Sequence, residues 1–273
     1  MATAEQSLLL GTSGYDYPEW KGIFYPDDLK RKDFLSYYST QFNALELNNT
    51  FYNMPTSERM LSFYERSEGR LSFSVKANRL LTHEVGADWK LQAKLFCDAV
   101  GPLLEKSSLC TVLFQFPQSF HYTNENRIYL AKLIDEFKSF PVVVEFRHEE
   151  WIKESVLAGL NDRGASIALC DMPDLKYLPK RVFPEPVEGP STSSSLFYLR
   201  LHGRNANAWY ADTNTPNGSA RYDYNYTDNE LKEFVPVIQN VILTGKKPIV
   251  FFNNHPNGSG AKNAKRLFEL LQV

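Results

Sequence analysis

The sequence predicts an α/β protein with a (β/α)8 TIM-type barrel, formed as a single domain over residues 1–273. Three observations support this fold class. Short apolar runs alternate with amphipathic segments along the chain, which is typical of a parallel sheet whose strands are joined by helices. There are eight such runs, the number of strands in this barrel. Polar residues collect at the carboxyl ends of the runs, where such barrels carry their active sites.

The predicted strands are rich in Val, Leu, Ile and Phe, as buried strands are. They cover Leu8–Ser13, Ala44–Asn48, Leu71–Lys76, Leu109–Phe116, Val142–Arg147, Ala165–Cys170, Leu196–His202 and Ile249–Asn253. A doubly wound open sheet is the main alternative, but it usually has fewer strands and a glycine-rich first turn. The segment Gly11–Gly14, which follows the first run, does not match the GxGxxG pattern of that turn.

Helices are predicted between most of the strands, because small polar residues that cap helix N-termini precede segments of helical periodicity. The predicted helices are Met60–Arg66 after Thr56, Trp89–Glu105 after Asp88, Arg127–Lys138 after Thr123, Leu231–Leu243 after Thr227, and Lys262–Leu270 after a glycine-rich turn. The turn-prone segment Pro184–Ser195 lies where the sixth helix belongs. We interpret it as a long loop that replaces this helix.

The composition argues against several classes of protein. Thirty basic and 32 acidic residues leave a net charge of −2, which argues against a surface that binds nucleic acid or an anionic membrane throughout. A local basic pocket remains compatible with this charge. Three scattered cysteines do not form a disulfide framework or a CxxC zinc motif. No signal peptide and no apolar stretch of ~20 residues is visible, so we expect a cytoplasmic protein without membrane contact.

The charged residues near the strand ends share one face of their strands. Alternate residues of a strand point to the same side, and the outer side of a barrel strand is covered by helices. The charged set is therefore expected to face the interior of the barrel. Its members are Glu46, Lys76, Gln115, Glu145, Arg147, Arg200 and His202. Two carboxylates against three permanent cations predict a locally basic pocket.

Five residues of this set are predicted to be catalytic: Glu46, Lys76, Glu145, Arg147 and His202. The imidazole of His202 normally titrates near neutral pH, so it could act as a general acid or base beside Glu145. A structural ion-pair network is the alternative, since buried charges need partners. A purely structural barrel interior is usually filled with branched aliphatic residues, which favours a functional role for the set.

The predicted ligand-binding residues lie at the strand ends and in the loops that follow. The aromatic ones could stack on a sugar or a base, or could pack the loops onto the barrel rim. The loop Asn254–Gly260 leads into the last helix, where backbone N–H groups could bind an anion. The long segment Gly203–Glu230 suggests a lid or a binding loop. The ligand-binding set is Ser13, Tyr15, Trp20, Asn48, Arg79, His83, Gln115, Arg200, Trp209, Asn253 and Asn254.

Two other chemistries use the same carboxylates. Glu46 and Glu145 could form the carboxylate pair of a glycosidase, but neighbouring cations favour the charged form of glutamate, which suits a general acid poorly. Metal ligation by these glutamates with Asp171, His202 and His255 is the second alternative. No HExxH or other tight spacing supports it, so no metal ligand is predicted. No cofactor is identified, and no nicotinamide or flavin motif is visible.

The same residues carry a resemblance to a known family. The motifs are Gly11–Tyr15 with Tyr17 and Trp20, Glu46–Tyr52, Phe73–Lys76, Gln115–Pro117, Glu145–His148, Tyr198–Gly203 and Phe252–Asn254. From about Gly11 to the C-terminus the sequence resembles the YecE-like family, or domain of unknown function 72. The resemblance implies a TIM-type barrel and little about activity. The barrel of that family is similar to those of endonuclease IV and xylose isomerase, which implies metal-assisted phosphodiester hydrolysis or nucleic-acid binding by analogy of fold alone.

Three functions are compatible with these residues. The first is an enzyme, a hydrolase or lyase, acting on a small anionic, phosphorylated substrate that Lys76, Arg147 and Arg200 bind at the C-terminal mouth of the barrel. The second is a nucleic-acid-binding or endonuclease IV-like barrel, whose arginines hold phosphates. The third is a metabolite-binding protein without turnover. The sequence predicts neither the substrate nor the oligomeric state.

Overall fold

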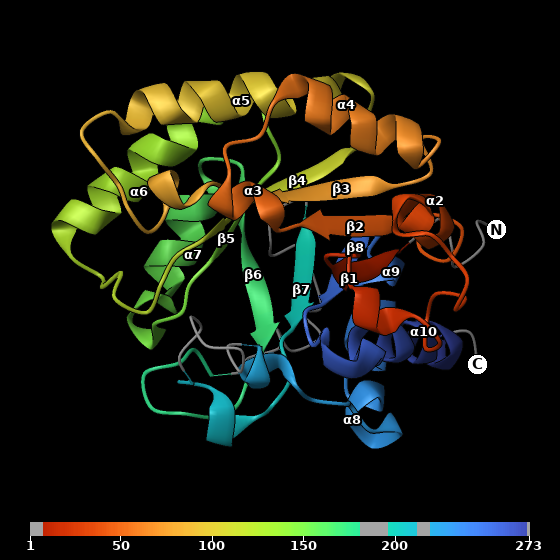
Figure 1. Ribbon diagram of the computed structural model, residues 1–273. Coiled ribbons are helices and arrows are strands. Elements are labelled where there is room, and N and C mark those ends of the chain that lie inside the picture. Colours follow the sequence, from red (N-terminus) through yellow and green to blue (C-terminus); the bar gives the residue numbers. More distant parts are fainter. Residues whose placement is uncertain (1–7, 181–195, 212–218, 272–273) are drawn as a thin grey trace.

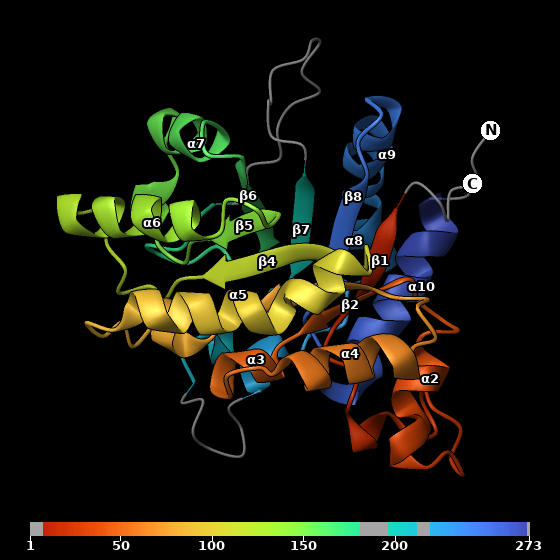
Figure 2. The ribbon, with the colours of Figure 1, turned by 90° about the horizontal axis from the view of Figure 1, so that it is seen from above.

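The computed structural model describes residues 8–180, 196–211 and 219–271. Its strands form a closed parallel barrel in sequence order, surrounded by helices (Figures 1 and 2). The strands are β1 (Leu9–Ser13), β2 (Ala44–Leu47), β3 (Ser72–Lys76), β4 (Leu109–Gln115), β5 (Val142–Glu145), β6 (Ala165–Asp171), β7 (Phe197–Leu201) and β8 (Pro248–Phe252). The predicted fold class is confirmed, and each predicted strand is present with ends that differ by one or two residues.

α-Helices are present in all the segments predicted to be helical and in several more. They are α2 (Phe34–Tyr38), α3 (Asn49–Tyr52), α4 (Ser57–Arg66), α5 (Trp89–Glu105), α6 (Asn124–Glu136), α7 (Glu154–Asn161), α8 (Asp228–Lys232), α9 (Val235–Leu243) and α10 (Ser259–Leu271). The side chains of Thr56 and Thr123 accept hydrogen bonds from the first turns of α4 and α6, so both predicted caps are confirmed. Asp88 precedes α5 as predicted but makes no such cap.

Short 3-10 turns complete the connections. They are η1 (Pro18–Trp20), η2 (Arg31–Asp33), η3 (Arg79–Leu81), η4 (Glu149–Trp151), η5 (Ala206–Ala208), η6 (Ala220–Tyr222) and η7 (Pro256–Gly258). No helix among the described residues is long and apolar enough to cross a membrane.

Two predicted connections differ from the expectation or lie outside the described residues. The helix predicted over Leu231–Leu243 is divided into α8 and α9. Pro236, in the first turn of α9, has no backbone N–H to bond to the preceding turn, so the helix cannot continue through it. The segment Pro184–Ser195, interpreted as the replacement of the sixth helix, lies outside the described residues, and 172–180 contain no helix.

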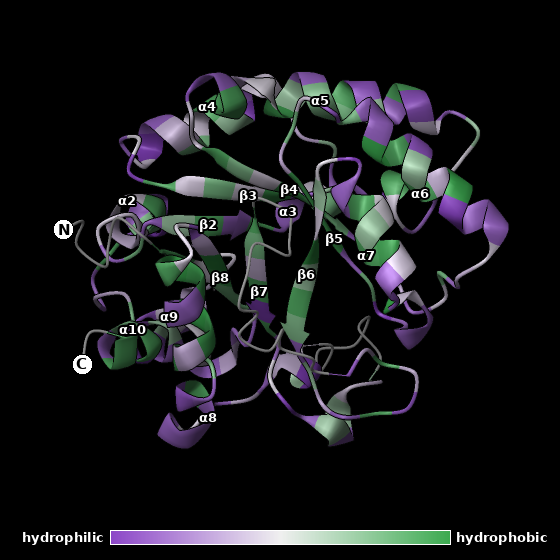
Figure 3. Ribbon diagram, turned by 180° about the vertical axis from the view of Figure 1, so that it is seen from behind, coloured by the Kyte–Doolittle hydropathy of each residue, from purple (hydrophilic) through white to green (hydrophobic). Residues whose placement is uncertain are grey.

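Apolar side chains form two layers, one on each side of the sheet. The larger layer lies between the strands and the helices and includes Phe73, Phe114 and Leu199. The smaller layer, the interior plug, fills the barrel with Leu9, Ala44, Leu113, Val143, Ala168, Tyr198, Ile249 and Phe251. Residues of the same parity further along each strand therefore stand above the plug, at the carboxyl-terminal mouth. Figure 3 shows hydrophilic colour at the arrowheads of β2 and β7.

Candidate functional site

Five buried side chains above the plug form one connected group, the lumen network: Glu46, Glu145, Arg147, Arg200 and His202. Arg200, on β7, lies between the glutamates, and its Nη2 and Nη1 donate to Glu46 Oε1 and Glu145 Oε2, each at 2.5 Å. Arg147 Nε donates to the other oxygen of Glu145. Arg147 Nη2 lies 3.2 Å from His202 Nε2. The parity of the strands thus brings these predicted residues together.

Neighbouring polar residues hold the lumen network in place. Ser13 Oγ donates to Glu46 Oε1 at 2.6 Å, and the Tyr198 hydroxyl donates to Glu46 Oε2 at 2.7 Å. Asn253 Nδ2 lies 2.9 Å from His202 Nδ1. Since every oxygen of Glu46 has a donor, the carboxylate has little freedom to turn.

Burial and close ion pairs determine the protonation states of the network. Burial alone would raise the pKa of Glu145, but Arg147 and Arg200 outweigh it and hold this pKa well below its ordinary value. Burial, and next the charge of Arg147, lowers the pKa of His202 to about 3. His202 is therefore neutral at pH 7. The two glutamates balance the two arginines, so the predicted excess of positive charge at the mouth depends on Lys76.

Lys76, at the end of β3, differs from the cations of the lumen network. Its Nζ donates to Gln115 Oε1 at 2.8 Å and lies 4.2 Å from the centre of the Phe51 ring. Among the described residues, no carboxylate lies within ion-pair distance of this amine. Burial, and next the charge of Arg200, lowers the pKa of Lys76 to about 7. A large fraction of the amine is therefore uncharged near neutral pH, the form in which lysine acts as a base or a nucleophile.

Further side chains near this amine come from α3, which follows β2, and from the connection after β3. The ring of Phe51 contacts both Lys76 and His83. Burial, and next the charge of Lys76, lowers the pKa of His83 to about 4, so His83 is neutral at pH 7. Arg79 is exposed and pairs with Glu84 at 3.3 Å.

Several buried polar atoms at the mouth have no hydrogen-bond partner among the described residues. They are Asn48 Oδ1, Arg200 Nε, Asn254 Oδ1 and His255 Nδ1. A buried polar atom without a partner costs about 1–3 kcal/mol, which a bound polar group would recover. These atoms are therefore candidate contacts for a ligand.

The two predicted tryptophans lie against the protein rather than open to a ligand. Trp20 is fully buried, and its Nε1 donates to the backbone oxygen of His255 at 2.8 Å. Trp209 packs against Met172 and Leu178 and is 3% exposed. Its ring lies 5.5 Å from the Arg147 guanidinium and 6.3 Å from the His202 imidazole, so it borders the lumen network. Both tryptophans pack their loops onto the rim, which is the alternative considered for the aromatic residues.

Two further predicted residues lie in supporting positions. Tyr15 is outside the barrel interior, where its ring contacts Tyr38 and Phe63. Asn254 Nδ2 donates to the backbone oxygen of Tyr224 and to Asn263 Oδ1, both at 2.8 Å, and so attaches the last loop to α10.

Two groups of side chains have the spacing of metal ligands. In the first, Glu145, Cys170 and His202, both oxygens of the glutamate accept from arginines. Burial also raises the pKa of the Cys170 thiol well above its ordinary value, so this group does not suit a divalent cation.

The second group is His121, His148 and Glu150, on the loop after β4 and the loop after β5. The Nδ1 atoms of His121 and His148 lie 3.3 and 3.7 Å from Glu150 Oε2. Imidazole and carboxylate ligands suit zinc or iron. Sequence reasoning missed this group because His121 lies on a different loop from His148 and Glu150, so the three ligands meet only in the fold.

Comparison with known proteins gives a consistent family. The model described as "Protein of unknown function DUF72" matches residues 9–273. The UPF0759 protein YunF of Bacillus subtilis (strain 168) is 27% identical over 276 residues, which cover 97% of this chain and 95% of that protein. A DUF72 family protein of known structure from Thermotoga maritima MSB8 is 32% identical, with a TM-score of 0.85 and coverage of 97% of this chain and 100% of that chain.

Two more distant structures agree in fold. A DUF72 family protein from Enterococcus faecalis V583 is 22% identical, with a TM-score of 0.81 and coverage of 97% and 96% of the two chains. A xylose isomerase-like TIM barrel protein from Mycobacterium smegmatis, solved in complex with magnesium, is 12% identical with a TM-score of 0.52 and coverage of 99% and 98%. At these identities the likeness concerns the fold alone.

Proposed function

We propose a function for this chain from the premise that it belongs to the DUF72 family, whose model matches residues 9–273. The chain is an enzyme, a lyase or hydrolase, that acts on a small anionic substrate at the carboxyl-terminal mouth of its barrel. Lys76 exchanges a proton with this substrate. The observation that carries the proposal is the position of the Lys76 amine at the mouth, where it donates to Gln115 and, among the described residues, has no carboxylate within ion-pair distance. Burial in this position lowers its pKa to about 7.

The chemistry of this lysine suits proton transfer. A general base works best when its pKa is close to the working pH, and a pKa of about 7 meets that condition. The hydrogen bond from Nζ to Gln115 Oε1 holds the amine in position at the mouth. When Lys76 takes a proton it becomes an ammonium without a carboxylate partner. A negative charge on the substrate stabilises this ammonium, which is why the proposed substrate is anionic.

The lumen network has a supporting role in this proposal. The pKa of His202 is about 3, so this imidazole does not exchange protons near pH 7. Arg147 and Arg200 keep their glutamate partners and act as fixed charges near the reacting amine. Glu46 and Glu145 position these arginines. Lys76 thereby takes the role of acid and base that the sequence suggested for His202.

The first experiment measures the thermal stability of the protein against a panel of ligands, with phosphate esters as the first class. Carboxylates, neutral sugars, short oligonucleotides and divalent metals complete the panel. A ligand at ~100 times its dissociation constant adds about 2.7 kcal/mol to the stability, which such a scan resolves. We expect small anions to stabilise the protein. Stabilisation by neutral sugars alone would contradict the proposal.

The second experiment tests Lys76 directly with the compounds that bind. We expect Lys76→Met to lower turnover by at least about 100-fold, because it removes the base but keeps the apolar stem. Lys90→Met is the control, since Lys90 is an exposed lysine of α5 paired only at the surface with Glu136. In the wild type, kcat/KM should rise with pH through an apparent pKa of about 7. Binding without any turnover would instead identify a metabolite-binding protein.

A further inference from the structure

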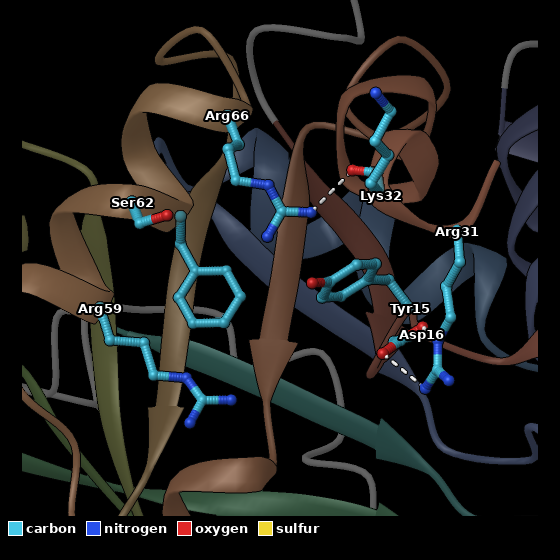
Figure 4. Close-up of a pocket in the computed structure, with 8 residues that line it drawn as sticks. Tyr15, Asp16, Arg31, Lys32, Arg59, Ser62 and Arg66 are labelled. Atoms are coloured by element: carbon cyan, nitrogen blue, oxygen red, sulfur yellow. Dashed lines mark hydrogen bonds and ion pairs between the residues drawn. The ribbon is translucent and has the colours of Figure 1, made fainter.

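A cavity of about 510 Å³ lies outside the barrel, between α4 and the segment that follows β1 (Figure 4). One wall is α4, which contributes Arg59, Ser62 and Arg66. These residues are three, four and seven positions apart, so they share one face of the helix. The facing wall holds Arg31 and Lys32 of η2. The two walls, α4 and η2, are separated in the sequence and come together only when the chain folds.

The cavity has a strong excess of positive charge. Four lining side chains are cations, and the one lining carboxylate, Asp16, binds Arg31 through both oxygens at 2.7 and 3.0 Å. Among the described residues, no carboxylate lies within ion-pair distance of Lys32, Arg59 or Arg66. Arg66 donates to the backbone oxygen of Lys32 at 3.0 Å, which orients its guanidinium but leaves its charge unbalanced. Three cations are thus unpaired in a chain of net charge −2.

Charge is distributed unevenly around α4. Glu58 and Glu65 are each next in sequence to one of the cavity arginines, and both are exposed. Neither forms an ion pair in the part of the chain that the structure describes. Successive residues of a helix point in different directions, so the acidic and basic side chains are separated. Gathering like charges is unfavourable without a counterion, and a bound anion removes this cost.

We propose that this cavity binds a small phosphorylated molecule that carries at least two negative charges. The planar guanidiniums of Arg59 and Arg66 match pairs of phosphate oxygens, and Lys32 adds a point charge. Figure 4 shows the Tyr15 hydroxyl directed into the space between these cations, where it can donate to the same anion. The rings of Tyr15 and Phe63, which line the cavity, offer an apolar surface to the organic part of the ligand.

The size of the cavity agrees with a small ligand. Its volume lies within the range of about 300–1,000 Å³ that is typical of small-molecule sites. The site contains none of the residues assigned to the barrel mouth except Tyr15, which sequence reasoning placed there. The proposal therefore goes beyond the function proposed for Lys76 and does not depend on it.

Titration calorimetry tests the site with inorganic pyrophosphate, AMP and a short single-stranded oligonucleotide. The variant combines Arg59→Gln and Arg66→Gln, both at exposed positions, so the fold is retained. The matched control combines Lys94→Gln and Lys138→Gln, which remove two exposed charges elsewhere. We expect pyrophosphate and AMP to bind the wild type and the control alike, and to bind the arginine variant at least about tenfold more weakly.

Three outcomes would overturn the proposal. One is that neither pyrophosphate nor AMP binds the wild type at millimolar concentration. Another is equal affinity of the wild type and the arginine variant. The third is an oligonucleotide that binds through these arginines much more tightly than AMP, which would make the partner a nucleic acid. The Lys76→Met variant should bind pyrophosphate as tightly as the wild type does. This result separates the proposal for the cavity from the proposal for Lys76 at the barrel mouth.

Discussion

The barrel interior contains two arginines, and the outer cavity contains three, of which Arg31 is paired with Asp16. The interior pair and the remaining cavity pair differ in their surroundings. Arg147 and Arg200 are buried and bind Glu145, and Arg200 also binds Glu46. Arg59 and Arg66 are exposed and bind no carboxylate in the described chain. The interior pair is electrically balanced, whereas the cavity pair is not.

The comparison shows that the number of cations in a site does not determine how strongly the site attracts an anion, because some cations are already neutralised by carboxylates. A cation that already has a buried partner contributes to structure, and its removal leaves the partner unpaired. A cation without a partner contributes little to stability and can bind an incoming anion. The basic pocket predicted at the mouth is therefore mostly neutralised, and the stronger positive region lies beside α4.

The largest effect is expected when an interior arginine is removed. Arg200→Met leaves Glu46 and Glu145 buried without their shared partner, so we expect a loss of about 3–5 kcal/mol in the free energy of unfolding. Urea denaturation measures it. Glu46→Gln keeps an acceptor for Arg200 and should lose less, about 1–2 kcal/mol, if the variant Arg200→Met is too unstable to purify. If both variants lost less than about 1 kcal/mol of unfolding free energy, water would be replacing the missing partner, and the network would not be tightly paired.

An intermediate effect is expected from acid. The unfolded chain protonates His202 below its ordinary pKa of 6.5, whereas the folded protein does so only near 3, so stability falls as the pH drops from about 6.5 toward 3. Glu145, whose folded pKa is lowered, adds to this loss below about 4.5. From pH 7 to pH 5 we expect His202 to account for about 2 kcal/mol. The variant His202→Asn should lose less free energy of unfolding between pH 7 and pH 5 than the wild type. Denaturation at both pH values measures this difference.

Two other histidines also contribute to the acid dependence of stability, and their contribution is the same in the wild type and in the variant. Burial lowers the pKa values of His83 and His255 to about 4, so both contribute a loss in the same direction in the wild type and in the variant. The contribution of His202 is therefore the difference between the pH dependences of the wild type and of His202→Asn. Identical pH dependences would mean that the pKa of His202 is not lowered in the folded protein, which would contradict the neutral imidazole described for the lumen network.

The smallest effect is expected at the cavity. Arg59→Gln with Arg66→Gln should change the free energy of unfolding by less than about 0.5 kcal/mol, because both side chains are exposed and have no carboxylate partner. The change should be stabilising at low salt, since it relieves repulsion, and should vanish as salt is added. Denaturation at two salt concentrations measures it. A clear loss of stability would show that these arginines have a structural role, and the contrast with Arg200 would disappear.

Local rules were sufficient to predict the strands and the inward-facing residues. The strand pattern has a period of two, so Glu145 and Arg147, or Arg200 and His202, could be assigned to one face without knowledge of the fold. Closure of the barrel then brings these faces together, and the lumen network follows. Thr56 and Thr123 were recognised as caps for the same reason, since capping depends on a few adjacent residues.

Properties that depend on distant contacts could not be predicted. The ion pairs of the lumen network join different strands across the barrel. The pairing of Arg200 with Glu46 therefore could not be predicted from the sequence. The burial of Trp20 depends on its bond to His255, which is far away in the chain. The cavity was missed for a similar reason. The spacing of Arg59 and Arg66 on one helix face is visible in the sequence, but Lys32 joins them only in the folded protein.

The position of Trp209 has an optical consequence. The emission of an indole depends on the polarity and charge around it, and this ring lies over the Arg147 guanidinium and contacts the imidazole of His202. The chain has four tryptophans, of which Trp20 and Trp151 are also buried but show no ring contact with His202 or Arg147 in the described chain. A charged molecule that binds beside Arg147 therefore changes the electric field at the ring of Trp209. The protein therefore carries its own fluorescent reporter of access to the barrel.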